Sequence, residues 1–174
     1  MTPADTAAVV LHPLERHHLA QTLTWANDPE FARLMDRARR LDPAEHDRWY
    51  TALGSRTDTV YFAVETAADG RHVGNVWLAD IDPRHRKAEV RIVIGDRACM
   101  GRGIGRAAID LAARYAFDVL GLHRVYAYVL AFNHPARRAF EKAGFTMEGT
   151  LRDDRRTGDS YVDAWVLGRV ASQV

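Results

Sequence analysis

The sequence has 174 residues, 47% of them hydrophobic and 27% charged, which predicts one globular domain over residues 1–174. Lys and Arg total 24 against 23 Asp and Glu, so we expect no nucleic-acid binding, which needs a basic surface. The single cysteine, Cys99, excludes an internal disulfide, and the absence of a long apolar run or a signal pattern predicts a cytoplasmic protein without membrane contact.

The first quarter of the chain predicts a strand and then helices. Ala8–Leu14 is a short apolar run interrupted by Pro13, and Glu15–Trp25 has helical spacing of its apolar residues. Asp28-Pro29 and Asp42-Pro43 each combine a capping side chain with proline at the first helical position. We therefore expect a helix to begin at each pair.

The period of the pattern then changes from helix to strand. Thr59–Glu65, His72–Ile81 and Lys87–Ile94 are rich in β-branched and aromatic residues, and the Asp-Gly pair within Ala68–Arg71 indicates a hairpin turn. This region predicts an antiparallel meander.

The second half alternates helices and strands. A helix is expected over Arg106–Leu120 and another over Pro135–Ala143, with the strand His123–Leu130 between them. Gly121 and Gly144 follow the helices as expected left-handed stops. Two closing strands are expected over Phe145–Leu151 and Ser160–Val170, so the order is mixed α/β.

A glycine-rich loop between the strand Lys87–Ile94 and the next helix carries the main functional signal. The loop contains Met100, Gly101, Arg102, Gly103, Ile104 and Gly105 and is followed by Arg106. Unpaired N–H groups at a helix start bind anions, and glycines allow a ligand to approach, so a diphosphate is the natural guest. The preceding meander argues against a Rossmann site, and no Gly-Lys-Ser/Thr follows, whereas a tight turn without a ligand remains open.

Several motifs in order resemble the GNAT superfamily of N-acetyltransferases. After the glycine-rich loop comes Asn133-x-x-Ala136-x-x-x-Phe140-Glu141-Lys142-x-Gly144-Phe145. The early Trp25-x-Asn27-Asp28-Pro29-Glu30 and the late Glu148-Gly149-x-Leu151-Arg152 are similar to the branch with ribosomal-protein N-terminal, polyamine and amino-sugar acetyltransferases. The similarity covers nearly the whole chain.

The resemblance implies both a fold and a co-substrate site. The fold would be a mixed, mostly antiparallel sheet of six to seven strands with about four helices on its two faces. The sheet would splay between its middle strands, beside a bulge in Lys87–Ile94. Acetyl-CoA would bind with its diphosphate on the loop from Met100 to Arg106 and its pantetheine arm along Ile92, Val93 and Ile94. Asn133, Phe140 and Lys142 match positions on the CoA side, and Met100 departs from the residues usual there.

Acyl transfer needs a proton acceptor for the amine, and Glu89 is the first candidate base. It lies on the strand before the loop, where related branches carry an acidic residue. The alternative is a structural ion pair with Arg91 or Arg86. His46 and His123 are weaker base candidates, and we expect no metal.

The donor of a proton to the leaving thiolate is less defined. Many superfamily members have a tyrosine where this chain has Phe140, which cannot donate a proton. Tyr128 and Asn133 are candidates, with Tyr126, water or an unaided thiolate as alternatives, and ordinary strand packing explains the tyrosines equally well.

The acceptor amine should be bound by the more variable segments Trp25–Met35, Asp42–Trp49 and Arg152–Tyr161. Trp25, Trp49, Glu89 and Arg152 are the predicted contacts, although core packing and a solvated hairpin tip explain them too. The acceptor would be a small-molecule amine or a protein N-terminus.

Two other functions stay open. The chain could be a non-catalytic acyl-CoA-binding or sensing module, because of Phe140, or a nucleotide-binding interaction protein. A homodimer is also possible, with Tyr161–Val170 as its contact.

Overall fold

The computed structural model describes residues 9–34 and 39–171, and its centre is a seven-stranded sheet with the order β1-β2-β3-β4-β5-β7-β6. Every neighbouring pair of strands is antiparallel except β4 and β5, which are parallel. The mixed, mostly antiparallel sheet is therefore confirmed. The strands are β1 (Val9–Pro13), β2 (Val60–Thr66), β3 (His72–Asp82), β4 (Lys87–Ile94), β5 (Arg124–Leu130), β6 (Thr146–Thr157) and β7 (Ser160–Val170).

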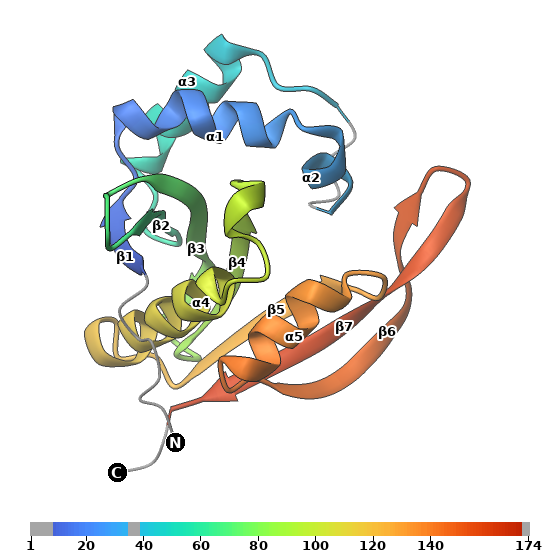
Figure 1. Cartoon of the computed structure of the whole chain (residues 1–174). Coiled ribbons are helices and arrows are strands. Elements are labelled where there is room, and N and C mark those ends of the chain that lie inside the picture. The colour runs from blue at the N-terminus through green and yellow to red at the C-terminus, as the bar shows by residue number, and fades with distance from the viewer. Residues whose placement is uncertain (1–8, 35–38, 172–174) are drawn as a thin grey trace.

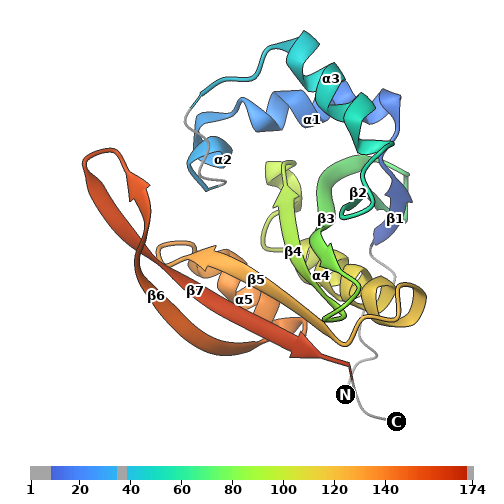
Figure 2. The same cartoon turned by 180° about the vertical axis from the view of Figure 1, so that it is seen from behind.

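Five α-helices accompany the sheet in the described residues, against about four expected. Helices α4 and α5 lie over one face of the sheet, and α1, α2 and α3 form a separate cluster beside the ends of β2, β3 and β4 (Figures 1 and 2). The helices are α1 (Leu19–Ala26), α2 (Pro29–Leu34), α3 (Pro43–Leu53), α4 (Ile104–Arg114) and α5 (His134–Lys142).

Both predicted Asp-Pro helix starts are confirmed. The N–H of Ala44 donates to Asp42 Oδ1 at 2.8 Å, and the N–H of Glu30 donates to Asp28 Oδ1 at 2.9 Å. Each aspartate satisfies a backbone donor that the first helical turn leaves unpaired.

Two predicted boundaries are wrong for identifiable reasons. The first long helix of the second half begins at Ile104 rather than Arg106, because Gly103 at its N-cap takes a φ of 82° that favours glycine. It then widens into a π-helical turn over Tyr115–Val119, before Gly121 with a φ of 62°. Strand β6 extends to Thr157 because its charged end, which resembles a loop, pairs with the start of β7.

The expected dimer contact through Tyr161–Val170 could not form by pairing of this strand with a second copy. Strand β7 lies between β5 and β6, so both of its edges are paired within the chain. The edge strands of the described sheet are β1 and β6. An assembly formed by strand pairing would have to use one of those edges.

The sheet splits between β4 and β5. Their pairing comprises only Lys87 with Arg124, Ala88 with Val125, and Glu89 with Tyr126, and the strands then diverge (Figure 2). The expected splay is thus confirmed. The irregularity beside it differs from the expected bulge in β4, because it inserts an extra residue in β3, between Ala79 and Asp82.

The core lies between the sheet and helix α4. Ala108 and Ala112 of α4 and Ala116 of the π-helical turn that follows it are fully buried. Their small side chains let the helix pack in one core with Val76 and Val90 of the sheet. Burying such valines contributes about 1.5–3 kcal/mol each. Within the described residues, no helix is both long and apolar enough to cross a membrane.

Gly95 follows β4 at a point where no side chain fits. A Cβ placed on Gly95 would lie 2.1 Å from Cδ2 of the Trp25 indole. We expect Gly95→Ala to lower the free energy of unfolding by about 1–3 kcal/mol, because the buried indole must move. Urea denaturation measures the loss.

Gly54→Ala is the matched control, because a Cβ at Gly54 meets only the Thr51 carbonyl oxygen at 3.5 Å. Equal urea midpoints for Gly95→Ala and Gly54→Ala would contradict the close packing of Trp25 on this turn.

Candidate active site

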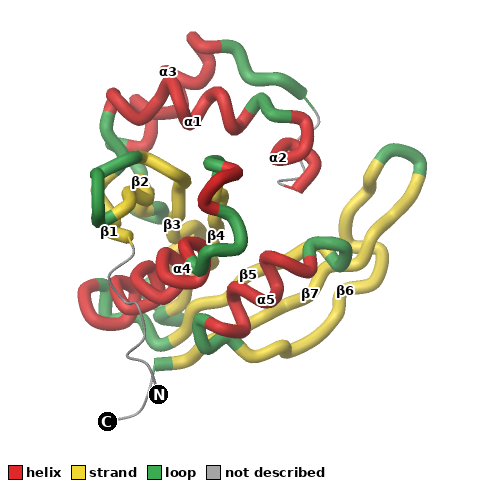
Figure 3. Tube along the Cα trace, viewed as in Figure 1, coloured by secondary structure: helices red, strands yellow, loops and turns green. Residues whose placement is uncertain are grey.

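The loop after β4 presents bare backbone at the start of α4. A short 3₁₀ turn, Arg97–Cys99, precedes it, and Figure 3 shows the loop leading from this turn into the helix. Gly101 and Gly103 have φ angles of 73° and 82°, and a Cβ on either would meet nothing within 4 Å. No side chain caps α4 at Gly103, and the first turn of the helix ends with the N–H of Ala107 donating to the Gly103 carbonyl at 3.0 Å.

This arrangement fits the diphosphate of a coenzyme A thioester. The first N–H groups of α4 have no partner within the helix, and the helix dipole makes that end positive. The guanidinium-bearing residues Arg102 and Arg106 are exposed beside the loop. Backbone donors, open space and positive charge therefore coincide where the sequence predicted them.

A cleft of about 280 Å³ opens where β4 and β5 diverge. It brings together most of the residues predicted for the reaction, from both strands and from α5. Its walls include Glu89, Ile92, Tyr128, Asn133 and Phe140. Past Glu89 and Tyr126 the facing backbone edges of β4 and β5 have no strand partner between them, so an extended ligand could pair there.

Glu89 is buried at the point where the strands separate, with 5% of its surface exposed. Arg91 Nη2 donates to Glu89 Oε2 at 2.6 Å, so the predicted ion pair exists. Among the described residues Arg91 is the hydrogen-bond partner of this carboxylate, and Oε1 remains for another donor. The carboxylate raises the pKa of Arg91, whose charge also lies 3.6 Å from Asp80.

The candidate proton donors lie on β5 and at the start of α5. Tyr128 is 43% exposed and lines the cleft, with its ring centroid 5.7 Å from that of Tyr126. Burial and then the charge of Glu89 raise the pKa of Tyr126, so its hydroxyl stays protonated at neutral pH. Asn133 caps α5 by accepting from the N–H of Ala136 at 3.2 Å, which occupies its amide oxygen.

A second cavity, of about 270 Å³, lies between the sheet and helices α1, α2 and α3. Trp25 and Trp49, both predicted to contact the acceptor, line it. His46, considered as a base, is also in its wall, with its ring stacked on Trp49 at 4.9 Å. Two of the three predicted acceptor segments therefore meet here, although Met35 lies outside the described residues.

Besides Ile94 and the loop from Met100 to Arg106, three predicted residues line neither cavity. Lys142 is exposed in the last turn of α5, His123 is exposed before β5, and Arg152 is exposed on β6. Arg155 lines the cleft instead of Arg152. Between Leu151 and Arg155 strand β6 contains two extra residues relative to β7, so Arg155, and not Arg152, pairs with Val162.

Comparison with known proteins identifies the family. The Acetyltransferase (GNAT) domain family matches residues 8–146. The chain belongs to the GNAT acetyltransferase family. Membership makes the loop at α4 part of an acyltransferase fold and removes the nucleotide-binding interaction protein as an alternative.

Relatives of this GNAT chain include polyamine acetyltransferases. The spermidine N(1)-acetyltransferase of Vibrio cholerae is 35% identical over 102 residues, which cover 59% of this chain and 58% of the relative. The crystal structure of spermidine N-acetyltransferase from Vibrio cholerae in complex with CoA and spermine superimposes with a TM-score of 0.87 at 27% identity, covering 94% and 95% of the two chains. A dodecameric structure of the Vibrio cholerae enzyme has a TM-score of 0.77 at 28% identity, covering 94% of each chain.

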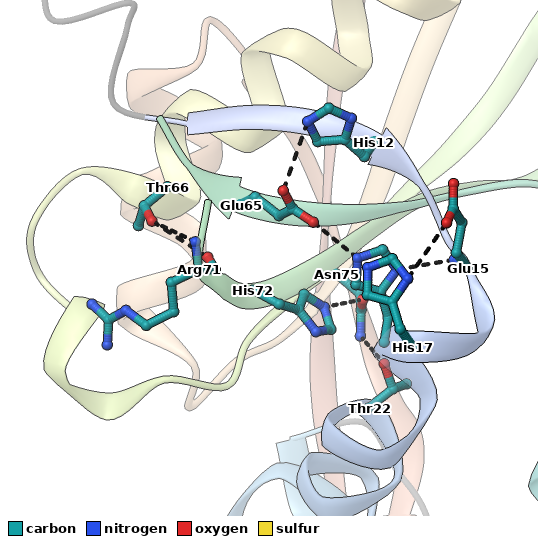
Figure 4. A network of polar contacts seen from close by, with 10 residues as sticks. His12, Glu15, His17, Thr22, Glu65, Thr66, Arg71, His72 and Asn75 are labelled. Carbon is teal, nitrogen blue, oxygen red and sulfur yellow. Dashed lines mark hydrogen bonds and ion pairs between the residues drawn. The ribbon is translucent and has the colours of Figure 1, made fainter. Parts of the chain in front are cut away.

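Figure 4 shows a histidine-rich network that the sequence did not reveal. Two of its residues, Thr22 and Asn75, are also in the wall of the second cavity. His17, His18 and Glu65 could approach a metal ion. The N–H of Glu15 donates to His18 Nδ1 at 2.9 Å, so neutral His18 carries its proton on Nε2, 2.9 Å from Glu65 Oε1. A metal at Nε2 would have to displace that proton, and the pair is therefore better suited to a hydrogen bond than to coordination.

His72 in the same network has one buried ring nitrogen without a partner. Asn75 donates its amide to Thr22 at 3.1 Å, so its oxygen accepts from His72 Nε2 at 3.0 Å. Among the described residues, His72 Nδ1 is buried without a hydrogen-bond partner. Protonation would place a donor at Nδ1 with no acceptor, and burial lowers the pKa of His72 below its usual value of 6.5.

Stability should therefore fall in acid through His72. The unfolded chain binds a proton here at higher pH than the folded chain, so the stabilisation is complete above about pH 6.5 and is lost as the pH falls below it. We expect the urea midpoint of the wild type to fall between about pH 8 and pH 5, and less so for His72→Gln.

His123→Gln replaces an exposed histidine and serves as the control. The prediction is wrong if His72→Gln and His123→Gln keep the same pH dependence as the wild type.

Proposed function

We propose that this chain transfers the acetyl group of acetyl-CoA to a primary amine by direct attack within a ternary complex. The amine nitrogen forms a bond to the thioester carbonyl carbon, the carbon–sulfur bond breaks, and the thiolate of CoA leaves and takes up a proton. The acceptor is a small-molecule amine, and the alternative acceptor is the N-terminus of a protein. The anion-binding loop at α4 beside a cleft that holds a buried carboxylate is the observation that carries this proposal.

The residues divide between the two substrates. The backbone from Met100 to Arg106 would hold the diphosphate, and the free edge of β4 at Ile92, Val93 and Ile94 would pair with the pantetheine arm. Phe140 and Asn133 line the cleft on the α5 side.

Glu89 is proposed to accept the amine proton through Oε1, directly or through one water. The pairing of Oε2 with Arg91 holds the carboxylate in one orientation. Tyr128 is proposed to donate to the leaving thiolate, because it lies on the opposite wall of the same cleft. A thiolate is a good leaving group, so this proton contributes less than the base.

The domain extent, the location and the assembly of the protein are also part of the proposal. Residues 1–174 act as one acyltransferase domain in the cytoplasm, and copies of the chain assemble into a dimer or larger oligomer. The dodecameric relative supports assembly. A non-catalytic acyl-CoA-binding module is the second candidate, and Phe140, 3% exposed and packed edge-on against Phe145 at 5.0 Å, favours it by leaving its position without a hydroxyl.

The diphosphate site predicts a specific defect on loop substitution. Gly103→Ala adds a methyl group into the space left open over the loop and strains a φ of 82°. We expect the dissociation constant for acetyl-CoA, measured by isothermal titration calorimetry, to rise at least about tenfold, which corresponds to about 1.4 kcal/mol.

Gly70→Ala is the matched control, with a φ of 64° and nothing within 4 Å of the added Cβ, on a hairpin away from α4. If Gly70→Ala weakens acetyl-CoA binding as much as Gly103→Ala, or if the wild type does not bind acetyl-CoA at all, the loop assignment fails.

The base assignment predicts a pH-dependent loss of turnover. Glu89→Gln keeps the shape and can still lie against Arg91, but it cannot accept a proton. We expect kcat to fall about 10²–10⁴-fold and the acidic limb of the pH–rate profile to disappear, as measured by release of CoA thiol with a reactive amine.

Glu148→Gln removes another carboxylate paired with an arginine, Arg124, outside the cleft, and serves as the control. Unchanged turnover of Glu89→Gln across pH would exclude Glu89 as the base. Tight acetyl-CoA binding with no turnover on any amine would favour the non-catalytic module.

A further inference from the structure

The cavity between the sheet and the α1–α3 cluster has an aromatic interior. The rings of Tyr61 and Trp77, paired across β2 and β3, stack with centroids 4.7 Å apart, and Trp49 meets Tyr61 edge-on at 5.2 Å. Trp25 and Phe31 add two buried rings from the helices. Rings from five separate positions on both layers thus line one space of about 270 Å³. A cavity of roughly 150 Å³ is enough to hold a benzene ring.

The amide, hydroxyl and carboxylate side chains Asn75, Thr22 and Glu45 of this wall already have partners. The Asn75 amide donates to the Thr22 hydroxyl at 3.1 Å, and the Asn75 oxygen lies 3.0 Å from His72 Nε2. The one carboxylate in the wall, Glu45, is paired with both nitrogens of the Arg39 guanidinium, one of them at 2.8 Å. Arg39 accordingly lowers the pKa of Glu45. Within the described residues, the wall therefore offers hydrophobic surface and no unpaired carboxylate.

The cavity is aligned with the proposed base along one face of β4. Val93 is in its wall, and Arg91 and Glu89 follow on the same face at two-residue steps, about 13 Å from Val93 to Glu89. The backbone of Arg91 pairs in register with Trp77, a wall residue of the cavity, and its guanidinium contacts Glu89 at 2.6 Å and lines the cleft. An elongated acceptor with its amine at Glu89 would pass this positive charge.

We propose, on the basis of the function proposed above, that this cavity binds the body of the acceptor and selects a monoamine with an aromatic or branched aliphatic end over a polyamine. The apolar end displaces water from the rings of Trp49, Tyr61 and Trp77 and gains hydrophobic stabilisation. A second ammonium group would lose its hydration beside Arg91 and meet a carboxylate already paired with Arg39.

Two amines that share a butylamine arm provide the test. In 4-phenylbutylamine the arm ends in an aromatic ring, and in spermidine it continues into a cationic aminopropyl group. We expect kcat/KM, from release of CoA thiol, to be at least about tenfold higher for 4-phenylbutylamine. A higher kcat/KM for spermidine would overturn the selectivity while leaving the acetyltransferase activity intact.

Trp49→Ala removes one wall of the cavity and should raise KM for 4-phenylbutylamine at least about tenfold with a smaller change in kcat. Tyr50→Ala alters the next residue of α3, which contacts Arg16 rather than the cavity, and is the matched control. Equal KM values for the two variants would overturn the proposal, provided circular dichroism shows both to be folded.

Arg39→Ala is the reciprocal variant, since it releases the Glu45 carboxylate from an exposed partner without touching the core. It should shift the ratio of kcat/KM toward spermidine, and an unchanged ratio would count against the charge argument.

Direct binding separates failure of this inference from failure of the proposed function. If no amine is acetylated, calorimetric titration with 4-phenylbutylamine alone still reports on the cavity. Binding that Trp49→Ala abolishes and Tyr50→Ala retains supports the inference. Absence of binding, or tighter binding of spermidine, overturns it.

Discussion

The end of the β4–β5 pairing at Glu89 and Tyr126 is the constraint on which the site depends. Below this point the two parallel strands complete each other's hydrogen bonds, and above it they diverge. In the divergent part, the described residues provide no strand between the facing edges of β4 and β5, whose outer edges pair with β3 and β7. The sheet therefore has an open edge in its middle, where an extended ligand could pair. The same divergence creates the cleft and places the buried carboxylate of Glu89 at its apex.

The two sides of the site are joined by contacts at the top of β4. Trp25 of α1 packs directly on Gly95, and Arg97, just before the glycine-rich loop, donates to Asp28 at 3.0 Å and to Glu30 at 2.6 Å. Arg97 lowers the pKa of Asp28, which also caps α2. The two ion pairs of Arg97 are largely exposed, so each contributes little alone. Together with the buried Trp25 contact they fix α1 and α2 to the segment that leads into α4.

The sequence could predict features that depend on local chemistry. Gly121 and Gly144 were identifiable because positive φ angles favour glycine, and Asp42-Pro43 because the first helical turn needs a side-chain acceptor for its free N–H groups. Glu89 could be placed beside the loop by counting along a strand. The roles of Arg152 and Arg155 could not be separated, because a register shift within β6 is not encoded in the alternation of polar and apolar residues.

The aromatic cavity likewise depends on contacts between residues far apart in the sequence, which the sequence alone did not predict. Trp25 and Trp49 were candidates for acceptor contacts, but Tyr61 and Trp77 read as ordinary strand residues. Their stacking follows from the register of β2 on β3, which brings them opposite each other on the face that α1 and α3 cover. Non-local pairing of this kind is set by the whole sheet, so no single segment of the sequence contains it.

Phe140 occupies a buried position that suits a phenylalanine better than a tyrosine. A hydroxyl at this position would be buried against Phe145 and would need a hydrogen-bond partner, whereas phenylalanine packs there without cost. The hydroxyls near the cleft instead come from β5, where Tyr126 lies opposite Glu89 and Tyr128 follows on the same face. The negative charge of Glu89 raises the pKa of Tyr126 further than burial alone. A negative charge at Glu89 thus disfavours the phenolate form of Tyr126, which keeps that hydroxyl available as a hydrogen-bond donor where β4 and β5 separate.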